Sequence, residues 1–298
     1  METVRSNLQL IDVADAQVAV REWGEGDVAV LAWHSLGPAA SGATMAELAP
    51  ALTEVGRRLL AVDAPGFGAS PALPPERYAL PSTVELFWGV ADELGLRRPV
   101  LAGHSWGGVV AAAAVAARPG DVRGLILLDS GHLDYQDAPG YPDDTSFEAL
   151  LREHGSPERQ VRAAGLDDLR AQLAPLVRRP LTEELVASFL AGVRETDDGT
   201  LVGIPTPESR AAAMKSICDV RASSLWHALA RAGVPILELL ATEPESAREQ
   251  NERAAPAFAA AVPQAEIVHV PAAGHALVAD AGPDVGRTIA DWHARLPG

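Results

Sequence analysis

Short apolar runs alternate with helical patterns along the first third of the chain. Four runs have the nearly continuous apolar character of strands buried on both faces of a parallel sheet, and they lie at residues 28–33, 59–62, 99–102 and 125–128. The segments between them have the apolar spacing or alanine content of helices, at residues 45–55, 84–94 and 109–117. Residues 18–23 mix apolar and polar positions, as an antiparallel edge strand does. The pattern predicts an α/β fold in which helices cover a mostly parallel sheet.

The pattern changes in the middle of the chain and then returns. From residue 131 to residue 231, acidic and arginine-rich helical segments follow one another without a convincing strand. Strands are predicted again at 236–240 and 266–270, and helices at 247–260 and 284–296. We therefore predict a core domain formed by residues 1–130 and 232–298, with residues 131–231 inserted as a helical cap.

Composition limits the classes of partner. The 298 residues suffice for one large domain with an insertion, and a formal net charge of −16 disfavours nucleic acid and anionic membrane surfaces. A single cysteine, Cys218, excludes an internal disulfide, and no cluster of histidine and cysteine suggests a metal site. Neither a signal peptide nor a transmembrane run is evident, so we expect a cytoplasmic protein. The oligomeric state is left open.

The segment Gly103-His104-Ser105-Trp106-Gly107 lies between a predicted buried strand and a predicted helix. A serine in so tight a strand-to-helix turn has strained backbone angles, and its neighbours two residues away must lack side chains for the chain to double back. The turn also places the serine at a helix N-terminus, where free amides favour negative charge. This setting makes Ser105 a candidate nucleophile, whereas an incidental serine in a glycine-rich turn is the simpler alternative.

Serine needs a neighbouring base at neutral pH, and histidine titrates in the right range. Of eight histidines, His275 is the best placed, because residues 271–275 form a loop just beyond a strand end, where open sheets build their sites. His104 should point away from the Ser105 hydroxyl across the turn, and His269 lies within a strand. We predict that His275 is the general base.

Three motifs resemble those of the α/β-hydrolase superfamily, over residues 18–296. They are the glycine-framed serine, the loop at residues 63–70, and Gly274-His275. The resemblance implies an α/β-hydrolase fold, with a mostly parallel eight-stranded sheet flanked by helices and a cap inserted after the sixth strand. It also implies a Ser-His-acid triad that works without a cofactor or a metal.

The triad acid has two candidates. In most of the family it follows the seventh strand, but counting from Pro235 the expected position falls on Pro244, which Glu243 and Glu245 flank, and either glutamate could serve if the loop shifts. Asp129 directly follows the predicted strand 125–128 and resembles the acid of family members, such as the zearalenone lactonases, that take it from that strand end. We favour Asp129, with Glu243 as the alternative, and an ordinary loop-capping role for Asp129 as the simpler explanation.

The resemblance also suggests an oxyanion hole formed by the amides of Trp106 and Leu36, although Ser35 stands where the family usually has glycine. Ser35, His132 and Trp226 are candidate substrate-binding residues, with core packing as the alternative for His132 and Trp226 and the capping of a turn as the alternative for Ser35. A capped apolar pocket favours an uncharged, moderately hydrophobic small molecule.

These features together predict a serine esterase or lactonase that forms an acyl-enzyme. Carbon–carbon bond or amide hydrolysis on the same scaffold and a ligand-binding pseudo-hydrolase are the alternatives. Haloalkane dehalogenases and epoxide hydrolases are disfavoured, because they resemble this scaffold but carry aspartate at the position of Ser105.

Overall fold

The central sheet has eight strands in the order β1-β2-β4-β3-β5-β6-β10-β11, in a computed structural model that describes residues 6–138 and 141–296. The strands are β1 (Asn7–Val13), β2 (Ala16–Trp23), β3 (Ala29–Trp33), β4 (Arg58–Asp63), β5 (Val100–His104), β6 (Gly124–Leu128), β10 (Ile236–Ala241) and β11 (Ala265–Val270). β2 pairs antiparallel with both β1 and β4, and the other pairs are parallel. The sheet is therefore mostly parallel, as predicted. The predicted edge strand, residues 18–23, lies in β2, one position inside the edge, and the outermost strand is β1, which the pattern did not reveal.

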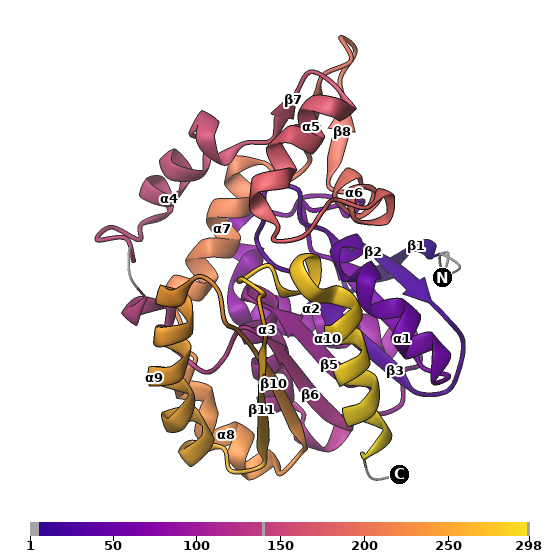
Figure 1. Cartoon of the computed structure of the whole chain (residues 1–298), viewed down its shortest axis with the longest axis vertical. Helices are drawn as coiled ribbons and strands as arrows, with labels where there is room; N and C mark the ends of the chain where they lie inside the picture. Colours follow the sequence, from indigo (N-terminus) through magenta and orange to yellow (C-terminus); the bar gives the residue numbers. More distant parts are fainter. Residues whose placement is uncertain (1–5, 139–140, 297–298) are drawn as a thin grey trace.

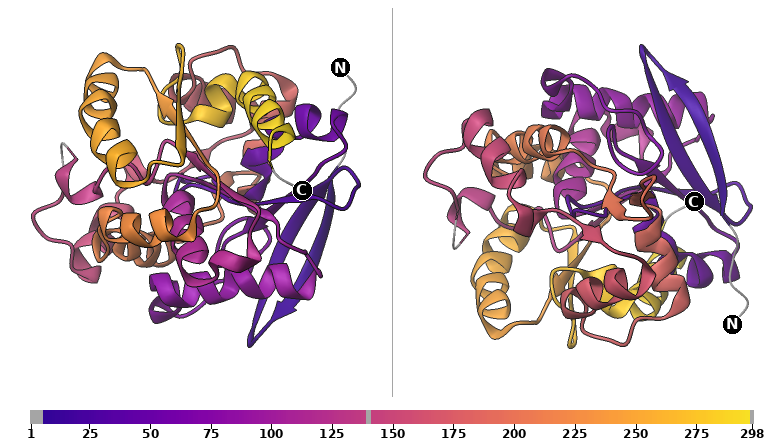
Figure 2. Two further views of the ribbon diagram at one scale, coloured as in Figure 1. Left: turned by 90° about the horizontal axis from the view of Figure 1, so that it is seen from below. Right: turned by 90° about the horizontal axis from the view of Figure 1, so that it is seen from above.

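Helices cover both faces of this sheet (Figures 1 and 2). One face packs against α1 (Ala49–Glu54) and α10 (Leu277–Ala294), and the other against α2 (Leu80–Glu93), α3 (Trp106–Ala117), α8 (Ser223–Ala232) and α9 (Glu245–Ala261). The central strands supply side chains to both layers. In β3, for example, Leu31 and Trp33 join the cluster with α2 and α3, whereas Val30 and Ala32 join the cluster with α1. Two buried faces explain why these strands read as continuous apolar runs.

The cap lies beyond the carboxyl ends of the parallel strands, at the top of Figure 1. Its helices are α4 (Phe147–His154), α5 (Leu166–Leu173), α6 (Glu183–Leu190) and α7 (Pro207–Cys218). It also holds a small antiparallel sheet in the order β7-β9-β8, made of β7 (Arg162–Ala163), β9 (Leu201–Gly203) and β8 (Val193–Glu195). The expectation of an insertion without strands was wrong, because two or three residues are too few to show an alternating pattern.

Short 3₁₀ helices complete the elements: η1 (Gly42–Leu48), η2 (Pro75–Tyr78), η3 (Pro119–Asp121), η4 (Tyr135–Asp137), η5 (Pro157–Arg159) and η6 (Ala174–Leu176). None of the helices in the described part of the chain is both long and apolar enough to cross a membrane.

The helix α8 belongs with the core, although the predicted cap, residues 131–231, includes almost all of it. It packs against α3 and α9, and its Leu229 joins the buried cluster on that face of the sheet. Trp226 of this helix stacks edge-on against Phe258 of α9, with 5.6 Å between ring centroids. The amphipathic pattern of α8 fits a cap helix and a core helix equally well, because both bury one face.

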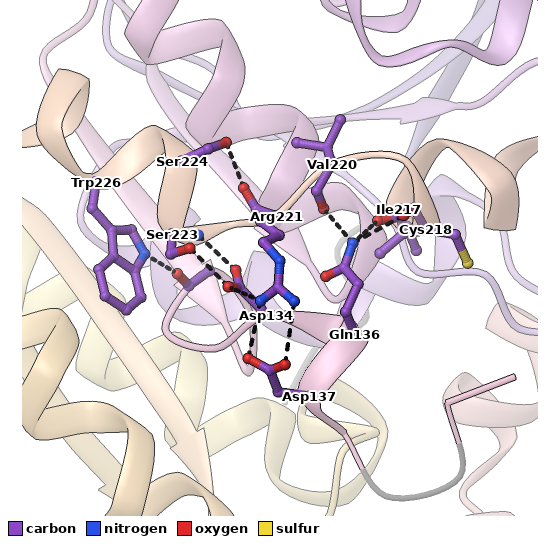
Figure 3. A network of polar contacts seen from close by, with 11 residues as sticks. Asp134, Gln136, Asp137, Ile217, Cys218, Val220, Arg221, Ser223, Ser224 and Trp226 are labelled. Carbon is purple, nitrogen blue, oxygen red and sulfur yellow. Dashed lines mark hydrogen bonds and ion pairs between the residues drawn. The ribbon is translucent and has the colours of Figure 1, made fainter. Parts of the chain in front are cut away.

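A polar network joins the two segments that connect cap and core (Figure 3). We call it the cap junction, formed by residues 131–137 and 217–226. Asp134 accepts hydrogen bonds from the backbone amide of Ser223 at 2.8 Å, from its hydroxyl at 2.7 Å and from Arg221 at 2.9 Å. Gln136 donates to the carbonyls of Ile217 and Cys218 in the last turn of α7 and to the carbonyl of Val220 beyond it. The outgoing and returning chains are thus fixed to each other.

Two substitutions in the cap junction are expected to differ in their effect on stability. The Asp134 carboxylate is 8% exposed and holds three donors, so Asp134→Ala should lower the free energy of unfolding by about 2–3 kcal/mol. The Arg221 side chain is 52% exposed, so Arg221→Met should cost less than about 1 kcal/mol. Urea denaturation measures both. Equal losses would show that the ion pair, and not the buried hydrogen bonds, holds the junction together.

Candidate active site

Ser105 occupies the sharp turn between β5 and α3, with φ 56° and ψ −118°. This is a strained conformation for a residue with a side chain. The glycines around it are required sterically: a Cβ on Gly103 would overlap the carbonyl of Gly107, and one on Gly107 would overlap the carbonyl of Trp33. The turn therefore raises the serine hydroxyl above the sheet at the N-terminus of α3, which is the geometry that the sequence pattern indicated.

His275 lies in the loop between β11 and α10, and it contacts two of the predicted residues. Its Nε2 is 2.9 Å from the hydroxyl of Ser105, and its Nδ1 is 2.6 Å from Oδ2 of Asp129. His104, the residue before the serine, reaches the same loop, since its Nε2 lies 2.6 Å from the backbone carbonyl of His275. Burial lowers the pKa of His104 to about 4, so this ring is neutral and its Nε2–H donates to that carbonyl.

Asp129 follows β6 directly in a left-handed conformation, with φ 49°. Its Oδ2 faces His275, while Oδ1 accepts hydrogen bonds from the amide of Ala241 at 2.9 Å and from Asn251 Nδ2 at 3.0 Å. Burial alone would raise the pKa of Asp129, but the contact with His275 and the amide donor outweigh it and lower the pKa below its usual value. The carboxylate is therefore ionised at neutral pH, and both of its oxygens have hydrogen-bond partners.

Glu243 does not share this arrangement. Its side chain is 40% exposed, and the carboxylate lies 3.8 Å from a guanidinium nitrogen of Arg178. The contact between this segment and the histidine loop is made by the backbone, where the amide of Glu243 donates to the carbonyl of Ala273. The structure thus brings Asp129, and not Glu243, to His275.

The proposed oxyanion loop is held by His34. Its Nε2 accepts a hydrogen bond from the amide of Ala64 at 3.0 Å, so its Nδ1 must carry the proton and donates to the carbonyl of Ser35 at 2.7 Å. Across the site, Trp106 is the first residue of α3, and its amide has no acceptor within the helix. Leu36 and Trp106 border the same cavity as Ser105.

Two cavities meet beside Ser35 and His104. The larger, of about 570 Å³, is bordered by Ser105, His275 and Asp129 and by apolar side chains, among them Leu36, Val109, Leu133, Met214, Ile217 and Val220. The smaller, of about 160 Å³, shares Ser35, Gly37, His104 and Ala276 with it and extends toward Leu173, Leu185 and Phe189 of the cap. No lysine or arginine borders either cavity in the part of the chain that the structure describes.

The three predicted substrate-binding residues are placed differently. Ser35 borders both cavities, and His132 borders the larger one although its side chain is almost fully buried. Trp226 borders neither, because its indole nitrogen donates to the carbonyl of Gly131 at 2.7 Å and its ring packs against Phe258. The structure therefore places Trp226 in the packing of the core, which was the alternative to substrate binding.

One residue of the site escaped sequence reasoning. Asn251, in the middle of α9, contacts Asp129 directly, yet no motif surrounds it. Its only signal is that it is a buried polar residue on a helix with many charged positions, and burial is not visible in the sequence.

Residues 31–185 match the family model described as the alpha/beta hydrolase fold. That span is just over half of the chain, and the protein belongs to the α/β-hydrolase family. The fold predicted from the sequence is thereby confirmed.

Two curated relatives carry the name 2-hydroxy-6-oxononadienedioate/2-hydroxy-6-oxononatrienedioate hydrolase. The protein from Pseudomonas sp is 29% identical over 192 residues, which are 62% of this chain and 64% of the relative. The protein from Burkholderia vietnamiensis is 31% identical over 121 residues, 40% of this chain and 42% of the relative. The match therefore spans less than two thirds of either relative. Among solved structures, E-2-(acetamidomethylene)succinate hydrolase superposes with a TM-score of 0.76 at 20% identity, over 97% of this chain and 100% of that one, which shows the shared fold.

Proposed function

We propose that this protein is a serine hydrolase that cleaves a carboxylic ester or lactone through an acyl-enzyme. One observation carries the proposal: Ser105, His275 and Asp129 form a continuous hydrogen-bonded line at the wall of an apolar cavity. This is the order of nucleophile, base and orienting acid that acyl transfer requires.

In the proposed mechanism, Ser105 attacks the substrate carbonyl while His275 Nε2 takes the hydroxyl proton. Asp129 holds the Nδ1–H tautomer and stabilises the imidazolium that forms. The amides of Trp106 and Leu36 receive the developing oxyanion. His275 then passes the proton to the leaving alkoxide and afterwards activates the water that releases the acid. These steps need no cofactor, since the serine supplies the nucleophile and the histidine carries the proton.

The cavities support an uncharged substrate. A carboxylate on the substrate would be moved from water into a space without lysine or arginine among its described residues, and an unpaired buried charge costs several kcal/mol. The smaller cavity is about as large as one that holds benzene, so it suits a compact apolar group on one side of the scissile bond. The dioates in the names of the relatives carry two carboxylates and fit this lining poorly.

Carbon–carbon bond hydrolysis is the second candidate, because both relatives are named as hydrolases of 2-hydroxy-6-oxo dioates, compounds without an ester bond. The same serine, histidine and aspartate would serve, and the difference would lie in the substrate. Charge is therefore the property that separates the two candidates.

A matched pair of esters tests the proposal. The p-nitrophenyl esters of 4-methylpentanoic acid and of succinic acid, the latter as the monoester, have acyl groups of equal shape and differ in one negative charge. We expect kcat/KM to be about 100-fold lower for the charged ester, after subtraction of its uncatalysed hydrolysis. Equal or faster turnover of the succinate would contradict an uncharged substrate and favour the dioate class.

A further inference from the structure

A second line of buried polar groups lies behind the proposed catalytic acid. Asn251 of α9 donates from Nδ2 to Oδ1 of Asp129 at 3.0 Å and to the carbonyl of Ala241 at 3.0 Å. Its Oδ1 lies 2.8 Å from Nε2 of His132, and Nδ1 of His132 lies 3.3 Å from Oε1 of Glu238 in β10. Asn251, His132 and Glu238 are all buried, and Glu238 is 0% exposed.

The partners fix the positions of the protons in this line. Asp129 and the carbonyl of Ala241 are acceptors only, so the atom of Asn251 that faces them must be the amide nitrogen. The oxygen of Asn251 therefore faces His132, whose Nε2 must carry a proton and donate it. Its Nδ1 is then free to share a proton with Glu238 alone.

The His132–Glu238 pair is an ion pair at neutral pH. Burial would lower the pKa of His132, but the contacts with Glu238 outweigh it and raise the pKa to about 9. Burial raises the pKa of Glu238 to about 7, which is still below that of His132, so the proton of the pair lies on the imidazole. The charged groups facing the imidazolium are Glu238 in β10 and Asp129 at the end of β6, with His275 beyond Asp129; Asn251 closes the side formed by α9.

A buried ion pair is weak as a source of stability, because desolvation offsets much of the attraction. An apolar pair of similar size would serve the packing of the core at least as well. The buried polar line is better explained by its effect on the Asp129 carboxylate. Two donors hold Oδ1 of Asp129, and Oδ2 is left to contact His275.

We propose that Asn251, His132 and Glu238 are positioning residues for the reaction. Asn251 fixes the carboxylate of Asp129, and the His132–Glu238 pair fixes the orientation of the Asn251 amide by keeping the proton on Nε2 of His132. This inference rests on the proposed serine-hydrolase function.

The test uses the rate at which a fluorophosphonate phosphonylates Ser105, since that rate depends on the triad and needs no natural substrate. Asn251→Leu removes the donor to Asp129 at nearly constant volume, and we expect a rate about 10–100-fold lower. Gln264→Leu is the matched control, because it also removes an amide donor to a backbone carbonyl but lies outside both cavities. We expect it to react at the wild-type rate, and melting temperatures show that each variant is folded.

Two substitutions of Glu238 separate hydrogen bonding from charge. Glu238→Leu leaves Oδ1 of Asn251 as the acceptor for His132, so a neutral ring keeps its proton on Nε2 and the rate should stay near that of the wild type. In Glu238→Gln, the oxygen that accepts from the amide of Ser130 also faces Nδ1, so it competes with Asn251 for the single proton of a neutral ring and the rate should fall toward that of Asn251→Leu.

The outcomes are distinct. Wild-type protein that is not phosphonylated at Ser105 would overturn the serine-hydrolase proposal itself. If the wild type reacts, a folded Asn251→Leu protein that reacts as fast would overturn the positioning role of Asn251. Equal rates for Glu238→Leu, Glu238→Gln and the wild type would overturn the part assigned to the ion pair.

Discussion

Ser105→Ala is expected to reduce kcat/KM for a neutral p-nitrophenyl ester by at least about 10⁴-fold. The substitution removes the atom that attacks the carbonyl, and no other hydroxyl is recorded within hydrogen-bond distance of His275 Nε2 in the described residues. Stability should change little, since an alanine retains the Cβ that the strained turn already accommodates. Ester hydrolysis and the melting temperature, measured on the same preparation, check both expectations.

Ser224→Ala provides the control for this substitution. The hydroxyl of Ser224 donates to the carbonyl of Arg221 in the cap junction and borders neither cavity, so activity should be unchanged. Ser105→Ala protein that turns over the ester at a rate comparable to the wild type would contradict the acyl-enzyme mechanism. A fluorophosphonate adduct on a different residue would do the same.

The positions of Ser105 and His275 were predictable because local sterics and a strand end define them. A serine at φ 56° needs glycine at positions 103 and 107, and a segment of five consecutive residues, 103–107, is enough to recognise this requirement. His275 follows a strand whose apolar pattern is recognisable, so its place at the carboxyl edge of the sheet follows from the fold. Neither inference requires knowledge of a distant contact.

The remainder of the site depends on distant contacts that no local pattern records. Whether Asp129 or Glu243 reaches His275 depends on how the loops after β6 and β10 are folded. Asp129 has a left-handed backbone conformation, and its carboxylate contacts His275. Asn251 is brought to it from a helix 122 positions away in the sequence.

The missed elements have similar physical causes. The outermost strand β1 has exposed Leu8 and Leu10, so its apolar residues do not mark a buried face. The strands of the cap are too short to show periodicity. The role of α8 depends on the surface that its apolar side meets, which is α3 and not the pocket.

A comparison of Asp129→Asn with Glu243→Gln tests the assignment of the acid. In Asp129→Asn, the oxygen of the new amide should keep the two donors that Oδ1 now accepts, from Ala241 and Asn251. The amide nitrogen would then face His275 and donate to Nδ1, which places the histidine proton on Nε2. In that tautomer Nε2 cannot accept the proton of Ser105, so we expect kcat to fall by about 10⁴-fold with little change in the melting temperature.

Glu243→Gln should leave kcat within about twofold of the wild type, because the carboxylate is partly exposed and pairs only loosely with Arg178. The two substitutions exchange the same atoms, so each serves as the control for the other, and steady-state kinetics on one neutral ester suffices. Loss of turnover in Glu243→Gln alone would assign the acid to the strand end after β10. It would also mean that the 2.6 Å contact between His275 and Asp129 breaks when substrate binds. Loss in Asp129→Asn alone would show that the acid lies at the end of β6, where Asn251 already holds it.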